Sequence, residues 1–209
     1  MNSSTSQETP SSQRKTLTDV LRERTFFIVD PIVTFLARYQ ISPNTLTVLG
    51  TLGHFLVAWL IVLGQMRPAG LALMLIAPLD GLDGALARKL GRKAGGFGAF
   101  LDSTLDRLAE IVVFGGFLIY ASNSSDPRML ATTYIAITGS LMVSYARARA
   151  EALSLSCRIG ILSRVERYFV LTITLLLGYP MVGLAIIAIF AYITVAQRIF
   201  HVWQQSVRE

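Results

Sequence analysis

Four aspartates lie in a strongly apolar part of the chain, in two short clusters. Asp80 and Asp83 belong to the run D-G-L-D-G-A-L-A-R, and Asp102 and Asp106 belong to G-A-F-L-D-S-T-L-D. Spacings of three and four residues place each pair on one face of a helix. Carboxylates at membrane depth are costly and are rarely kept without a partner that neutralises them. Because oxygen ligands suit hard divalent cations, the two pairs predict a catalytic metal site.

The composition sets the class of protein that must position these acids. The chain has 209 residues, is 53% hydrophobic and has a mean hydropathy of +0.54, which predicts an all-α integral membrane protein. Residues 41–205 form one membrane domain with six expected transmembrane helices, at about 44–63, 68–90, 96–121, 129–152, 161–178 and 181–203. Residues 15–40 carry too many charges to span and predict a juxtamembrane amphipathic helix at the interface, whereas 1–14 predict a disordered tail.

The distribution of basic residues predicts the orientation in the cell membrane. Of the 19 Lys and Arg residues, only Arg67 and Arg128 fall in outer loops if the N-terminus is cytoplasmic. The positive-inside rule then places both termini in the cytoplasm. Counted from the outer helix ends at 1.5 Å per residue, all four aspartates lie about 20–30 Å inward, near the cytoplasmic boundary. Membrane topology accounts for the net charge of +6, so no nucleic-acid partner is expected.

The acids allow two other interpretations. The aspartates could form only buried ion pairs with Arg88, Lys89 and Arg107, but four carboxylates at one depth exceed what helix packing needs. Alternatively, the acids could line the ion path of a small cation transporter. Such a path requires polar groups through the full membrane depth, whereas the outer half of every predicted span is almost wholly apolar.

The aspartate pattern resembles a family signature. D-x-x-D-G-x-x-A-R followed by G-x-x-x-D-x-x-x-D is similar to the signature of the CDP-alcohol phosphotransferases, here Asp80, Asp83, Gly84, Ala87, Arg88, Gly98, Asp102 and Asp106. The resemblance implies that Asp80, Asp83, Asp102 and Asp106 hold two Mg²⁺ ions, for which Mn²⁺ could substitute. It also implies that Asp106 is the general base. The implied reaction transfers a lipid phosphate from a CDP-linked lipid to an alcohol and releases CMP.

The same resemblance implies further contacts and partners. The CDP-linked lipid would be bound by Asn44, Thr45, Asp80, Gly84, Arg88 and Gly95, the last at a position where some relatives carry a hydroxyl residue. Family members resemble homodimers, so a homodimer surrounded by membrane lipids is expected.

Arginines near the cytoplasmic helix ends suggest the acceptor. The run S-Y-A-R-A-R-A-E with later E-R and Q-R is similar to prokaryotic phosphatidylinositol phosphate synthases and their archaeal counterparts. By that resemblance, Ser144, Arg147, Arg167 and Arg198 would bind the phosphate of a phosphorylated polyol, inositol 1-phosphate. Guanidinium groups suit such a phosphate. Glycerol 3-phosphate is the alternative acceptor, and topology alone could also place arginines at these helix ends.

Overall fold

All regular structure in the described part of the chain is helical. The computed structural model describes residues 30–91 and 95–207. A helical segment at 30–38 precedes seven helices: α2 (Pro43–Val62), α3 (Met66–Ile76), α4 (Leu79–Lys89), α5 (Gly96–Asn123), α6 (Pro127–Ala152), α7 (Arg164–Leu177) and α8 (Pro180–Ser206).

The helices follow the six apolar segments predicted from the sequence, with one difference. The second segment forms two helices, α3 and α4, because Pro78 at the junction lacks the backbone N–H that a continuous helix needs. Four stretches of the described residues are long and apolar enough to cross a membrane: α2, α3 and α4 taken together, α6, and α8. Helix α7 has only 14 residues, and α5 carries charged residues in its first half. These four stretches support a multi-pass membrane protein.

Large apolar side chains on the outside of the bundle agree with a lipid environment. On α2, Leu52 and Trp59 are 56% and 60% exposed, although the helix buries Val57 and Ile61 completely on its other face. A soluble protein rarely exposes such continuous apolar surface, whereas a bilayer favours it.

The segment before α2 packs against the helix that carries the first aspartate pair. Val33 is 2% exposed and forms a small apolar cluster with Leu46, Leu82 and Leu86. Lys89 Nζ lies 2.9 Å from Asp30 Oδ1 and also donates a hydrogen bond to the Thr34 hydroxyl. The predicted tail at 1–14 and residues 15–29 of the predicted amphipathic helix lie outside the described residues.

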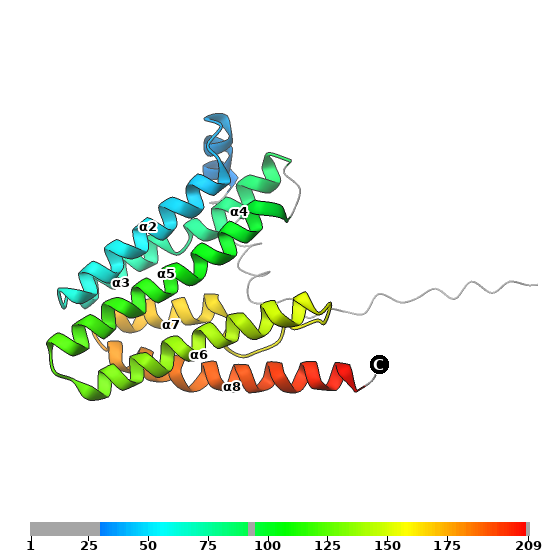
Figure 1. Ribbon diagram of the computed structural model, residues 1–209. Coiled ribbons are helices and arrows are strands. Elements are labelled where there is room, and N and C mark those ends of the chain that lie inside the picture. Colours follow the sequence, from blue (N-terminus) through cyan, green and yellow to red (C-terminus); the bar gives the residue numbers. More distant parts are fainter. Residues whose placement is uncertain (1–29, 92–94, 208–209) are drawn as a thin grey trace, which may run out of the picture.

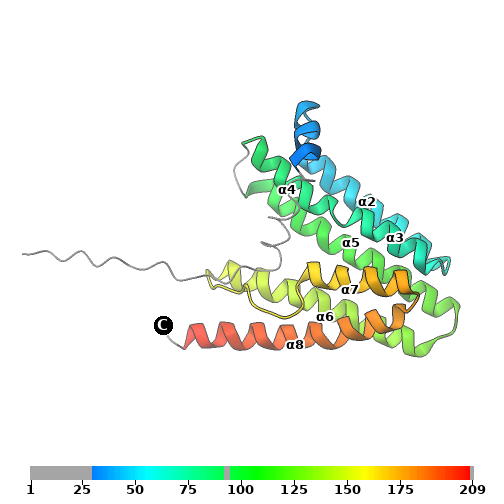
Figure 2. The same cartoon turned by 180° about the vertical axis from the view of Figure 1, so that it is seen from behind.

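The helices form two groups that meet at one end of the molecule. Helices α2 to α5 form one group and α6 to α8 the other, and the groups diverge toward the end that carries α4 (Figures 1 and 2). The main core lies where the groups meet, with Ile61, Leu73, Phe117, Leu175 and Leu184 fully buried. This apolar core holds the helices in register and leaves the polar side chains at the divergent end.

Small residues allow the closest helix approach. A Cβ added at Gly116 of α5 would lie 2.8 Å from the carbonyl oxygen of Ala58 on α2, so a larger side chain there would push the two helices apart. This contact fixes the position of α5, which carries the second aspartate pair, relative to α2.

Candidate functional site

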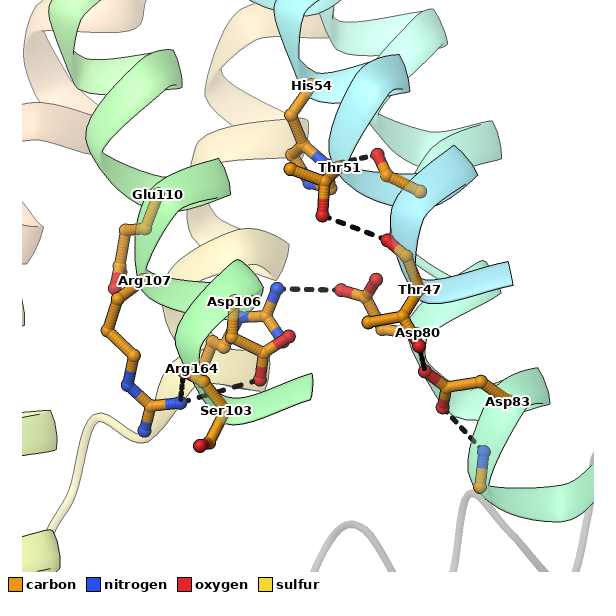
Figure 3. Close-up of polar contacts among 12 residues, drawn as sticks. Thr47, Thr51, His54, Asp80, Asp83, Ser103, Asp106, Arg107, Glu110 and Arg164 are labelled. Atoms are coloured by element: carbon orange, nitrogen blue, oxygen red, sulfur yellow. Dashed lines mark hydrogen bonds and ion pairs between the residues drawn. The ribbon is translucent and has the colours of Figure 1, made fainter. Parts of the chain in front are cut away.

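Helix α4 directs its two aspartates toward α2. Leu82 and Leu86 are buried against the segment before α2, which sets the rotation of α4 about its axis. Asp83 is 6% exposed, and its Oδ2 accepts a hydrogen bond of 2.6 Å from the hydroxyl of Thr47, itself 5% exposed. This bond joins side chains 36 residues apart in the sequence and fixes the orientation of the Asp83 carboxylate (Figure 3).

The other aspartate of α4 lies against a glycine of α2. A Cβ added at Gly50 would lie 3.1 Å from Asp80 Oδ1, so the absence of a side chain there makes room for the carboxylate. Thr47, Gly50 and His54 occupy positions i, i+3 and i+7, so one narrow face of an otherwise apolar helix borders the acids. His54 Nδ1 donates to the Gly50 carbonyl at 2.7 Å, as a packed, helix-bonded histidine does.

Arg164 connects the two aspartate-bearing helices. It is the first residue of α7, and its Nη2 lies 2.7 Å from Asp80 Oδ2 on α4 whereas its Nη1 lies 2.6 Å from Asp106 Oδ1 on α5. One guanidinium group therefore bridges carboxylates from two helices (Figure 3). The guanidinium carbon also lies 5.0 Å from the centre of the Tyr168 ring, a cation–π distance.

The four aspartates are close enough to repel one another. Asp102 lies one turn before Asp106 on α5, and it interacts electrostatically with both Asp80 and Asp83. Asp106 interacts in the same way with Asp80 and Asp102. The structure thus brings together at one end of the bundle all four acids that the sequence predicted as metal ligands.

The acids of the described residues are not arranged to hold a metal ion in this conformation. Among residues 30–91 and 95–207, no three acidic, histidine or cysteine side chains are placed so that they could hold a metal ion. Arg164 lies between Asp80 and Asp106. The donor set nevertheless fits a divalent cation, because carboxylate oxygens are the ligands that Mg²⁺ and Mn²⁺ prefer and the acids lie on facing helices.

Of the cations considered as partners of the acids, Arg107 does contact the site and Lys89 does not. Arg107 Nη1 lies 3.6 Å from Asp106 Oδ2, but its side chain is 36% exposed. Lys89 pairs with Asp30 instead of with an acid of the site. Arg164, which was not predicted as a site residue, forms ion pairs with both Asp80 and Asp106.

The residues expected to bind the donor lie around the same end. Asn44 and Thr45 are in the first turn of α2, Gly84 and Arg88 are on α4, and Gly95 precedes α5 with φ of 100°. A Cβ added at Gly98 would lie 3.4 Å from Asn44 Oδ1, which shows that α2 and α5 approach closely there.

The residues expected to bind the acceptor differ in their surroundings. Ser144 on α6 is 9% exposed, and Arg147, one turn on, is exposed and forms a 2.8 Å ion pair with Glu151. Arg198 is 5% exposed; its Nε donates to the Ile159 carbonyl at 2.9 Å and its Nη1 donates to the Val143 carbonyl.

Arg167 is fully buried, unlike the exposed Arg147. It is 1% exposed, and its Nε and Nη2 donate to the two carboxylate oxygens of Glu110 at 2.7 and 3.1 Å. Its Nη1 donates to the Leu162 carbonyl at 3.1 Å. The three arginines are nevertheless close enough to interact, because Arg147 and Arg167 both repel the charge of Arg198. They therefore form a basic region, in which Arg167 contributes charge from a buried position.

Several residues of the site were not identified from the sequence. Thr47, Gly50, Arg164 and Tyr168 all contact the acids or each other, and Glu110 holds Arg167. One sequence feature could have indicated the α2 residues: small and polar residues recur at helical spacing within an apolar span, at Thr47, Gly50 and His54.

Comparison with known proteins identifies relatives over nearly the whole membrane region. Residues 40–203 match the family model described as CDP-alcohol phosphatidyltransferase. The archaetidylinositol phosphate synthase of Pyrococcus horikoshii is 40% identical over 166 residues, which cover 79% of this chain and 85% of that protein. The phosphatidylinositol phosphate synthase of Streptomyces avermitilis is 34% identical over 205 residues, covering 88% and 82%.

Solved structures share the fold. The crystal structure of Mycobacterium tuberculosis phosphatidylinositol phosphate synthase with CDP-DAG bound superimposes with a TM-score of 0.78 at 32% identity, covering 84% of this chain and 94% of that one. The structure of the same enzyme in complex with manganese and citrate gives a TM-score of 0.77 at 30% identity, covering 84% and 88%.

Proposed function

The chain belongs to the CDP-alcohol phosphatidyltransferase family, and on that premise we propose that it makes a phosphorylated phospholipid from a CDP-linked lipid. The acceptor is inositol 1-phosphate. An acceptor hydroxyl attacks the lipid-side phosphorus of the donor, the bond from that phosphorus to the CMP oxygen breaks, and CMP leaves. The single observation that carries this proposal is the convergence of four interacting aspartates from α4 and α5 at one end of the bundle.

The aspartates are proposed to hold two divalent cations, Mg²⁺ with Mn²⁺ as a substitute. Asp80, Asp83, Asp102 and Asp106 supply the oxygen ligands, and the manganese-bound mycobacterial relative supports a divalent metal. Such ions would offset the charge of the donor pyrophosphate and stabilise CMP as the leaving group.

Asp106 is proposed as the general base that accepts the proton of the attacking hydroxyl. Its carboxylate is largely shielded, with 15% of the side chain exposed, and it faces Arg164 and Arg107. Proton transfer at the attacking oxygen raises its nucleophilicity as the new bond to phosphorus forms. Because Asp106 also belongs to the proposed ligand set, the base lies beside the phosphate that is attacked.

The donor is proposed to lie between α2, α4 and the start of α5. Asn44, Thr45, Gly84 and Gly95 border that space, and Asp80 reaches it from α4. Arg88, on the same helix two turns after Asp80, is proposed to contact the CDP phosphates. The mycobacterial relative with CDP-DAG bound supports a donor of this chemical class.

The acceptor phosphate is proposed to bind in the basic region formed by α6, α7 and α8. Ser144, Arg147 and Arg198 supply the groups nearest the divergent end, and Arg167 lies behind them in its buried pair with Glu110. Relatives named for inositol phosphate products support this acceptor over glycerol 3-phosphate.

The membrane arrangement is also a proposal. We infer six spans, with α5 and α7 crossing beside the four more apolar segments, and a homodimer in the cell membrane. Both termini and the aspartates would face the cytoplasm, because Arg67 and Arg128 begin α3 and α6 at the opposite end of the bundle. An active site at that boundary lets the donor tails stay in lipid while CDP and the acceptor come from water.

Purified protein in liposomes with labelled CDP-diacylglycerol tests the proposal. Inositol 1-phosphate, glycerol 3-phosphate, serine and buffer are supplied in parallel, and CMP and the lipid product are both measured. The proposal expects CMP release and a phosphorylated inositol lipid with inositol 1-phosphate alone. Equal or faster turnover with glycerol 3-phosphate would assign the alternative acceptor, and no release with any of them would reject the activity.

A further inference from the structure

Arg164 contacts two of the proposed metal ligands, one on each of the two aspartate-bearing helices. Its Nη2 lies 2.7 Å from Asp80 Oδ2, and its Nη1 lies 2.6 Å from Asp106 Oδ1. The contact with Asp80 is also a hydrogen bond, and charge-assisted hydrogen bonds of this length are the strong ones. Both ion pairs are little screened, because all three side chains are 22% exposed or less. A planar guanidinium with donors on two edges is suited to bridging two carboxylates.

The same oxygens are those that a divalent cation would need. Asp80 and Asp106 come from α4 and α5, so a cation that joins the two helices must accept ligands from both. A carboxylate oxygen that is saturated by a guanidinium is a weaker metal ligand, because the two cations compete for the same negative charge. From this geometry we propose that Arg164 is an internal cation that competes with divalent metal for Asp80 and Asp106. The inference rests on the proposed function, which assigns those aspartates to metal.

Tyr168 keeps the displaced arginine close to the site. The ring lies four residues further along α7, 8% exposed, with its centre 5.0 Å from the guanidinium carbon. Rotation of the two nitrogens away from the carboxylates need not move the guanidinium off this ring face. Arg164 thus stays beside the donor phosphates and contributes positive charge there once the carboxylates have been released.

The exchange also explains how four acids can be kept together in an apolar protein. Arg164 offsets part of their mutual repulsion before loading, and divalent cations would offset more of it afterwards. One consequence is measurable: Arg164 lowers the affinity of the site for metal, although it lies at the centre of the site.

Mn²⁺ affinity of the full chain in detergent, measured by titration calorimetry without substrates, tests this role. Arg164→Gln is expected to bind Mn²⁺ about tenfold more tightly than the wild type, since it frees both carboxylates. Arg107→Gln is the matched control, because it removes the same charge from the same Asp106 at an exposed, 3.6 Å contact. Its expected gain is below about threefold, as exposed pairs contribute little.

Each outcome decides the inference. Unchanged or weaker Mn²⁺ binding by Arg164→Gln would overturn it, and an equal gain in both variants would show a general effect of net charge. If Arg164→Gln does not fold, Arg164→Lys replaces it, because one ammonium cannot bridge both carboxylates as a guanidinium does; wild-type affinity in that variant would also overturn the inference. The proposed function fails separately, through absence of CMP release by the wild-type protein.

Discussion

The buried pair between Glu110 and Arg167 gives a sharp prediction about stability. The two side chains are 3% and 1% exposed and share two hydrogen bonds of 2.7 and 3.1 Å. Glu110→Gln keeps the shape but leaves the guanidinium charge buried without a counter-charge. Breaking a buried pair in this way costs about 3–5 kcal/mol, so the free energy of unfolding should fall by that amount.

A double variant separates the loss of the pair from the loss of packing. Glu110→Leu combined with Arg167→Met removes both charges at similar volume, and such replacements are neutral or stabilise by about 1–4 kcal/mol. The free energy of unfolding of the wild type, Glu110→Gln and the double variant is measured by titration with a denaturing detergent in mixed micelles. A change below about 1 kcal/mol in Glu110→Gln, or a double variant less stable than that single variant, would refute the reasoning.

The double variant also tests what Arg167 does for catalysis. Because it is expected to fold, its kinetics are free of the instability of a single substitution. If Arg167 contributes charge to the acceptor site, the KM for inositol 1-phosphate should rise far more than the KM for the donor. Equal effects on both would indicate a general structural role.

Three further substitutions test the walls of the acid site and its base. Thr47→Val should weaken Mn²⁺ binding by about 10–100-fold, because the Asp83 carboxylate loses the hydrogen bond that orients it. Thr47→Ser should keep the hydroxyl and the affinity, and calorimetry that finds no loss in Thr47→Val would contradict this role. Gly50→Ala should slow CMP release about tenfold by displacing the Asp80 carboxylate, whereas Gly115→Ala, with open space around it, should not. Asp106→Asn should lower turnover by about 10²–10⁴-fold with donor affinity largely kept, and near-normal CMP release would exclude it as the base.

The sequence predicted the helices and the acid pairs well because both depend on local pattern. Apolar runs of span length place helices without knowledge of their partners, and spacings of three or four residues place Asp80 with Asp83 on one face. The break at Pro78, which divides the second predicted segment into α3 and α4, follows from the same local rules, since proline interrupts helices.

Contacts between distant segments could not be read from the sequence. Arg164 and Asp80 are 84 residues apart, and Arg167 and Glu110 are 57 apart. Both arginines lie near the start of α7, three residues apart, so they have similar sequence surroundings but different partners: one bridges the acids and the other is held by Glu110. Which of them faces the acids depends on how α7 packs against α3 and α8, and one sequence without its fold does not specify that.

The dependence of CMP release on divalent cations tests the central claim most directly. Wild-type protein and the Asp102→Asn variant are stripped with a chelator and then titrated with Mg²⁺ or Mn²⁺ in the presence of CDP-diacylglycerol and inositol 1-phosphate. The account predicts no release by the stripped wild type, full recovery with either ion, and no recovery of the variant at the same concentrations. CMP release that persists in the chelator, or a variant that recovers like the wild type, would contradict it.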